Sequence, residues 1–134
     1  MQALTDKTSL HSVYVVDEEG ISNIFTELKE ILASQIDNHT TLIYISPENS
    51  FIFDRELEIL QKRYPTQLVL HPVREKVMDA STRLQELLEA VINSNTKVRL
   101  IFILSGDEEL IHIVSDRLWF LGISKNQIKV YLLS

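Results

Sequence analysis

Residues 98–123 decide the fold, and they read VRLIFILSGDEELIHIVSDRLWFLGI. The first part, Val98 to Leu104, is the most apolar run in the chain and has the length of a buried strand. Asp107 follows in the position of a helix N-cap, before an amphipathic stretch that runs from Glu108 to Leu121. Gly122 fits the C′ position that ends such a helix. A buried strand, a short turn and a helix in this order are typical of a parallel α/β sheet.

The rest of the chain repeats this alternation of apolar runs and amphipathic stretches. Further strands are predicted at Val13–Val16, Leu42–Ile45, Leu68–Leu70 and Ile128–Leu133. Helical spacing of apolar residues predicts three more helices, over residues 21–32, 53–64 and 84–92. We expect Gly20 to end the loop after the first strand, Pro72 to end the third strand, and Asp79 or Ser81 to cap the third helix. The prediction is one α/β domain over residues 1–134, a three-layer αβα sandwich with a doubly wound five-stranded parallel sheet.

Composition narrows the class of protein. The 134 residues are 45% hydrophobic and 24% charged, which is typical of a single globular domain. The net charge of −6 argues against binding to nucleic acid or to an anionic membrane, because both need cations on the protein. The lack of cysteine excludes thiol chemistry, and the four histidines are too widely spread to suggest a metal site. With no apolar run of transmembrane length and no signal peptide in the first residues, we expect a cytoplasmic protein.

Two stretches of the chain carry a family resemblance. One leads from the strand at Leu42–Ile45 through Phe53-Asp54-Arg55-Glu56-Leu57 to Lys62-Arg63-Tyr64-Pro65. The other leads from residues 101–109 to the segment Leu121–Ile128. The first stretch resembles the second strand, the F-R-x-E-L helix and the x-Y-P motif of the ferredoxin–NADP reductase family. The second stretch is similar to the Y-x-C-G-P-x-x-M turn and the L-G-(V/I)-x-x-x-x-I segment of the same family. Val15–Ile24 is similar in placement to the first glycine-rich loop of that family.

The resemblance implies a pyridine-nucleotide-binding module that takes part in electron transfer. NAD or NADP would bind at the carboxyl ends of the strands, and no metal is implied. The cofactor-binding residues would be Gly20, Ser46, Glu48, Ser105 and Gly106, and no catalytic residue is assigned. The flavin-binding β-barrel that accompanies this module in the family has no counterpart in these residues. A separate flavin domain or another redox protein would therefore be the partner that accepts hydride.

The phosphate-binding loops depart from the family pattern. The first loop reads Asp17-Glu18-Glu19-Gly20, so carboxylates stand where glycine amides would hold a diphosphate. Each like-charge pair at about 4 Å costs roughly 1–4 kcal/mol at effective dielectric constants of about 80 to 20. The family's Cys-Gly-Pro becomes Ser105-Gly106-Asp107, which adds a further acid. The second strand ends without an arginine for a 2′-phosphate, and Glu48 could accept from ribose hydroxyls, which favours NAD over NADP.

These departures leave other interpretations open. One is a non-catalytic protein-interaction module that kept the fold and lost nucleotide binding. Another is a degenerate receiver domain, because acids also follow the first strand of receivers, although no aspartate ends the third strand here. Trp119 and Phe120 point about 100° apart on one helix, so we expect one of them to be exposed and to be a candidate anchor for a partner.

Overall fold

Five parallel strands form one sheet in the order β3-β2-β1-β4-β5. The computed structural model describes residues 10–34, 39–46, 53–76, 79–95 and 98–132. The strands are β1 (Leu10–Val16), β2 (His39–Ile45), β3 (Leu68–Val73), β4 (Arg99–Gly106) and β5 (Ile128–Leu132). The helices are α1 (Glu18–Ser34), α2 (Asp54–Arg63), α3 (Ser81–Ser94), α4 (Glu108–Phe120) and a short 3₁₀ turn, η2 (Lys125–Gln127). The predicted α/β fold is confirmed.

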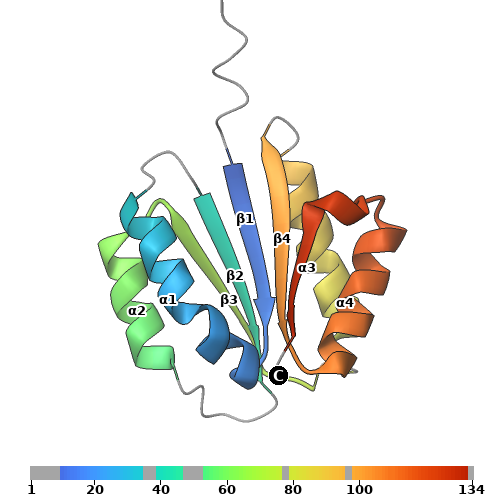
Figure 1. Ribbon diagram of the computed structural model, residues 1–134, viewed down its shortest axis with the longest axis horizontal. Coiled ribbons are helices and arrows are strands. Elements are labelled where there is room, and N and C mark those ends of the chain that lie inside the picture. Colours follow the sequence, from blue (N-terminus) through green and yellow to red (C-terminus); the bar gives the residue numbers. More distant parts are fainter. Residues whose placement is uncertain (1–9, 35–38, 47–52, 77–78, 96–97, 133–134) are drawn as a thin grey trace, which may run out of the picture.

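Two helices cover each face of the sheet, and Figure 1 shows the three layers. Strand residues alternate between the faces, so Tyr14 and Val16 of β1 pack under α1 and α2, while Val13 and Val15 pack under α3 and α4. All four of these side chains are fully buried. This two-sided burial explains why the central strands read as continuous apolar runs.

The strand order separates this fold from that of receiver domains. Here β1 lies between β2 and β4, and the direction of the chain across the sheet reverses between β1 and β4. Receiver domains have the order 2-1-3-4-5, in which the first strand lies beside the third. The degenerate-receiver interpretation is therefore wrong. The observed order is that of doubly wound dinucleotide-binding sheets.

Local signals at the ends of the elements were predicted with mixed success. Asp107 caps α4, since its Oδ1 accepts from the N–H of Leu110 at 2.9 Å, and Gly122 has the positive φ of +88° expected at C′. Pro72 does not end β3 but lies inside it, because β3 is an edge strand and a proline there sacrifices no ladder hydrogen bond. The N-cap of α3 is Ala80, with no side-chain cap.

Gly20 also differs from its prediction, because it lies inside α1 and not in a loop. The helix begins at Glu18, directly after β1 and Asp17, so the turn between strand and helix is one residue long. Several strands extend beyond their predicted apolar runs, and His39, predicted in a turn, begins β2. Backbone hydrogen bonding between neighbouring strands continues past the apolar residues. Hydropathy alone therefore cannot predict where a strand ends.

In the ranges that the structure describes, no helix is both long enough and apolar enough to cross a bilayer.

Stability is expected to fall as the pH drops below about 6.5, the ordinary pKa of histidine. Burial, and then the ring of His39 that stacks at 6.3 Å, lower the pKa of His11 in the folded protein. Burial lowers the pKa of His71 in the same direction. Between the folded and the unfolded pKa the unfolded chain binds more protons, so acid favours unfolding.

Urea denaturation at about pH 7.5 and about pH 5.5 measures this dependence. The free energy of unfolding should be lower at the acidic pH, and His11→Gln should reduce the difference. His112 is exposed, so His112→Gln controls for the loss of a histidine as such. An equal effect of the two substitutions would contradict the assignment to His11.

Candidate functional site

The candidate site is the crevice at the carboxyl ends of β1 and β4. These strands are neighbours, with Val16 in register with Ser105, and the strand order reverses between them. Ligands of open α/β sheets bind at such a switch point. Helices α1 and α4 begin directly after these two strands, so both of their N-termini lie at the crevice (Figure 1). Helix N-termini attract anions, so the backbone geometry suits a bound phosphate group.

The carboxylate of Asp17 occupies this anion position. Its Oδ1 accepts a hydrogen bond from the backbone N–H of Gly20 at 2.8 Å, as an N-cap does in α1. Its Oδ2 accepts from the backbone N–H of Asp107 at 3.1 Å, at the start of α4. One side chain thus bridges the N-termini of the two helices that would hold a diphosphate.

The two glycines of the crevice are needed for contacts within the protein. A Cβ on Gly20 would lie 1.8 Å from the carbonyl oxygen of Ser105, so Gly20 lets α1 pack directly on the end of β4. A Cβ on Gly106 would lie 2.6 Å from Oδ2 of Asp17, and the φ of Gly106 is +155°. The close backbone approaches that would serve a nucleotide are therefore made by the chain's own atoms.

Further acids surround the crevice. The first turns of α1 and α4 contribute Glu18, Glu19, Glu108 and Glu109. The hydroxyl of Tyr44 donates to Oε1 of Glu18 at 2.6 Å, which holds this carboxylate at the end of β2. No lysine or arginine lies in either first turn. The charge of the crevice is thus opposite to what a phosphate group needs.

The structure brings together three of the five residues predicted to bind cofactor. Gly20, Ser105 and Gly106 meet where α1 packs on β4. Ser46 is fully buried after the neighbouring strand β2, where its N–H donates to the carbonyl of Val73 at 2.9 Å. Glu48 lies outside the described residues, so its role stays a prediction. The hydroxyl of Ser105 is fully buried and has no hydrogen-bond partner among the residues that the structure describes.

A polar groove between α3 and α4 was not predicted. It holds two open cavities of about 300 and about 360 Å³, both lined by Ser81 and Arg117. The guanidinium of Arg117 donates to Oγ of Ser81 at 2.5 Å and to Oε1 of Gln85 at 3.3 Å. These pairs are 32 and 36 residues apart in sequence, so no local pattern could indicate them.

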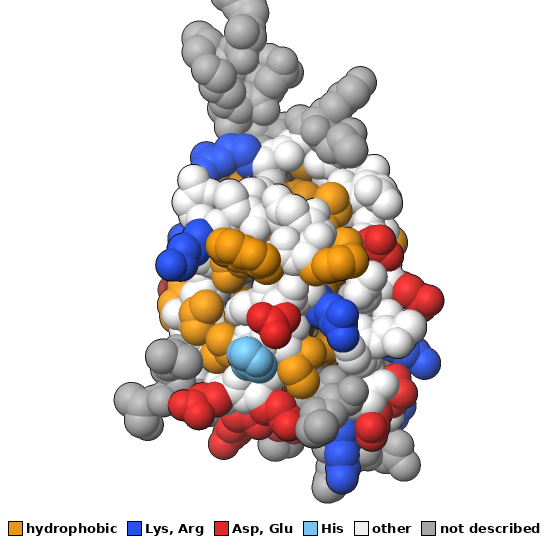
Figure 2. All heavy atoms as spheres, turned by 90° about the vertical axis from the view of Figure 1, so that its right-hand side faces the viewer, with side chains coloured by type: hydrophobic (Ala, Val, Ile, Leu, Met, Phe, Trp, Pro, Cys, Tyr) orange, Lys and Arg blue, Asp and Glu red, His pale blue; other side chains and the backbone are white. Residues whose placement is uncertain are grey.

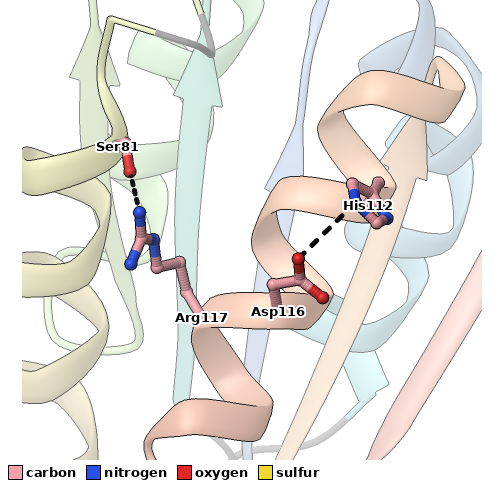
Figure 3. Close-up of polar contacts among 4 residues, drawn as sticks. All are labelled: Ser81, His112, Asp116 and Arg117. Atoms are coloured by element: carbon pink, nitrogen blue, oxygen red, sulfur yellow. Dashed lines mark hydrogen bonds and ion pairs between the residues drawn. The ribbon is translucent and has the colours of Figure 1, made fainter.

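The groove does not form a Ser-His-Asp triad. Nε2 of His112 lies 3.5 Å from Oδ2 of Asp116, but both side chains are largely exposed. Figure 3 shows Ser81 bound to Arg117 on the side facing α3, with His112 on the far side of Asp116. A nucleophilic serine must reach its histidine base, and this one does not. The groove therefore links α3 to α4 and offers no catalytic set. Over the described ranges, His, Asp and Glu form no cluster that could hold a metal ion.

Comparison with known proteins identifies the fold. No protein-family model matches the sequence, and no curated protein matches it. Among solved structures, ferredoxin-NADP+ reductase from Plasmodium falciparum superposes with a TM-score of 0.74 at 17% identity, over 97% of this chain and 55% of the reductase. The same reductase has been solved with 2'P-AMP, and that structure matches with a TM-score of 0.65 at 19% identity, over 97% of this chain and 53% of the reductase.

Two flavohaemoglobin-type structures match as well. The FAD/NAD-binding domain of nitric oxide dioxygenase from Vibrio cholerae has a TM-score of 0.65 at 14% identity, over 91% of this chain and 50% of that domain. Flavohemoglobin from Malassezia yamatoensis has a TM-score of 0.70 at 13% identity, over all of this chain and 35% of its own. The chain therefore has the ferredoxin reductase-like NAD(P)-binding fold of flavin-dependent reductases. It spans about half the length of the reductases or less.

Proposed function

We propose that this chain is a non-catalytic protein-interaction module built on the NAD(P)-binding fold of flavin-dependent reductases. The observation that carries the proposal is the carboxylate of Asp17, which bridges the N-termini of α1 and α4 in place of a phosphate. Without a bound nucleotide the module has no hydride to transfer, so a fold of this kind would act by binding another protein.

Opening the crevice to a dinucleotide is energetically expensive. The carboxylate of Asp17 would have to give up the two backbone hydrogen bonds that it accepts, and a hydrogen bond to a charged group contributes roughly 1.5–3 kcal/mol. Even the lower total, about 3 kcal/mol, corresponds to more than about a hundredfold loss of affinity. Repulsion between the phosphates and the acids of the two first turns adds to this cost. A dissociation constant in the micromolar range corresponds to a binding free energy of about −8 kcal/mol. With both costs included, this dissociation constant would become millimolar or weaker.

A second candidate function is an NAD(P)-binding half that works with a separate flavin domain or redox protein. It is favoured by the hydroxyl of Ser105, which is buried beside the crevice without a partner in the part of the chain that is described. In this case NAD or NADP would be lined by Gly20, Ser46, Glu48, Ser105 and Gly106, and hydride would pass from the nicotinamide to a flavin on the partner. The 2'P-AMP complex of the Plasmodium reductase shows that a protein with this fold holds a nucleotide fragment.

Titration with NADH and with NADPH separates the two candidates. Under the interaction-module proposal, neither cofactor raises the melting temperature of the wild-type protein at millimolar concentration. Under the second candidate, cofactor at about 100 times its dissociation constant should add about 2.7 kcal/mol of stability. A saturable shift in the wild-type protein would reject the proposal.

Two variants test whether the carboxylate of Asp17 is what weakens cofactor binding. Asp17→Ser keeps a side-chain cap for α1 but removes the carboxylate, so we expect it to bind the cofactors at least about tenfold more tightly than the wild type. Glu30→Gln removes one exposed charge from the same helix away from the crevice, and its affinity should stay close to that of the wild type.

A further inference from the structure

We propose that the outer edge of β5 pairs with β5 of a second copy of this chain and joins the two sheets in a two-fold symmetric dimer. The inference names the partner of the proposed interaction module, so it rests on the proposed function. Strand β5 ends the sheet, and no strand in the described ranges pairs with its outer edge. An unpaired strand edge offers N–H and C=O groups that another strand can bind.

The backbone of Ile128 and Val130 forms the outer edge of β5. This follows from the other end of the sheet, where the N–H of Ser46 after β2 donates to the carbonyl of Val73 in β3. Val73 lies on the face that α3 and α4 cover, so β3 residues on this face direct their backbone groups across the sheet toward β5. All five strands are parallel, and Ile128 and Val130 lie on the same face. Their backbone groups therefore point to the free edge.

The two edges of the sheet differ in how they are protected. Strand β3 contains Pro72, which lies on the opposite face from Val73, so its nitrogen is at the outer edge of β3 and offers no N–H. Proline on an edge strand is a common device against pairing with another chain. Strand β5 has no proline, and the side chains of Val130 and Tyr131 are 42% and 38% exposed. The edge at β5 is therefore the one open to pairing.

Charge complementarity selects a second copy in one register. A two-fold axis at Val130 pairs the whole of β5 with itself in the antiparallel direction, and the two Val130 residues exchange backbone hydrogen bonds. Lys129 then lies opposite Tyr131 of the second copy, on the face that α1 covers. The hydroxyl of Tyr131 donates to Oε1 of Glu27 at 3.0 Å, so each lysine would approach a carboxylate of the other copy. An axis at Lys129 would instead set two lysines side by side, which is unfavourable.

On the other face, exposed apolar surface continues from β5 onto α4. Arg117 reaches α3 and Leu118 is buried, so helical spacing places Trp119 on the flank of α4 that faces away from α3. The side chain of Trp119 is 67% exposed, and Figure 2 shows apolar side chains gathered over α4 and the edge strand β5. A two-fold axis at Val130 turns this flank toward the same flank of the second copy. Pairing would therefore cover apolar surface as well as the strand edge.

The dimer is expected to be weak. Strand β5 has five residues, so its pairing makes a small interface. Interfaces below about 1,200 Å² are typical of weak and transient complexes. We therefore expect a dissociation constant of about 10–100 µM.

Cysteine cross-linking provides the test, because the chain has no cysteine of its own. Antiparallel residues that exchange both hydrogen bonds have Cα atoms about 5.5 Å apart, which suits a disulfide. Under mild oxidation with copper phenanthroline at about 100 µM protein, Val130→Cys is expected to form a covalent dimer in high yield. Val69→Cys is the matched control, since Val69 is 44% exposed on the other edge strand. Lys125→Cys gives an exposed thiol that lies before β5 and far from the axis, and it should not cross-link either.

Sedimentation velocity measures the same association without an added thiol. The wild type should change from monomer to dimer as its concentration rises through the expected dissociation constant. Lys129→Glu should weaken the dimer by at least about tenfold, because the new carboxylate would lie near Glu27 of the other copy. Lys62→Glu makes the same change of net charge at an exposed position in α2 and should leave the association unchanged.

The proposal is overturned if the wild type stays monomeric up to about 1 mM, or if either control cysteine cross-links as fast as Val130→Cys. It is also overturned if Lys62→Glu weakens association as much as Lys129→Glu. Assemblies that grow beyond a dimer would reject it as well, because a two-fold pairing of edges is closed. Binding of NADPH by the wild type would contradict the proposed function only, whereas a monomeric wild type contradicts this surface only.

Discussion

Gly20→Ala is expected to destabilise the protein by more than about 3 kcal/mol or to prevent folding. The added Cβ would lie 1.8 Å from the carbonyl oxygen of Ser105, which is backbone at the carboxyl end of the inner strand β4. Neither group can move without displacing α1 from β4, so the clash cannot be relieved by a side-chain rotation. Urea denaturation followed by circular dichroism measures the loss.

Gly122→Ala is the matched control for this variant. Gly122 has a positive φ of +88°, but a Cβ there would meet no atom within 4 Å. Its substitution should therefore cost only the backbone strain of a left-handed residue, roughly 1–2 kcal/mol. Equal losses for the two alanines would show that α1 does not pack on the end of β4 as described.

Asp17→Ala is expected to lower the free energy of unfolding by about 2–4 kcal/mol. The substitution removes the cap of α1 at Gly20 and the bond to the N–H of Asp107, which connects α1 to α4. Asp17→Asn keeps an oxygen for the cap of α1 but offers no second charged acceptor, so its loss should be smaller, about 1 kcal/mol. Thermal and urea denaturation of both variants measure the two contributions.

The control for charge is Glu19→Ala. Glu19 is exposed in the same turn, so its removal should change stability by no more than about 0.5 kcal/mol. The opposing effect is that Asp17→Ala relieves repulsion among the acids of the crevice. If that relief were the larger effect, the variant would equal or exceed the wild type in stability, and the bridging role of Asp17 would be rejected.

Much of the fold could be predicted from the sequence, because its signals are local. The apolar run that became β4, the cap at Asp107 and the C′ glycine at Gly122 each depend on a few neighbouring residues. The position of Pro72 within β3 depends on β3 being an edge strand, which is a property of the whole sheet. The predictions were therefore correct for the types of the elements and less so for their ends.

The geometry of the candidate site could be predicted from the sequence only in part. The sequence indicated that acids replace the glycines of the first loop, but Asp17 and Asp107 are 90 residues apart, and their contact depends on β1 lying beside β4. The exposure of both Trp119 and Phe120 was also missed, since we expected one of them to be covered. Helical spacing placed the two side chains 100° apart. Whether another element covers one of them depends on the position of β5 at the edge of the sheet, which helical spacing does not predict.

The amide resonances of Gly20 and Asp107 test the central claim most directly. In the ¹H–¹⁵N spectrum of the wild-type protein, both amides are held by the carboxylate of Asp17 and should keep their chemical shifts when NADPH or NADH is added to millimolar concentration. Saturable movement of both resonances at micromolar cofactor would show that a phosphate displaces the carboxylate, and it would contradict the account of a crevice closed by the protein's own side chain.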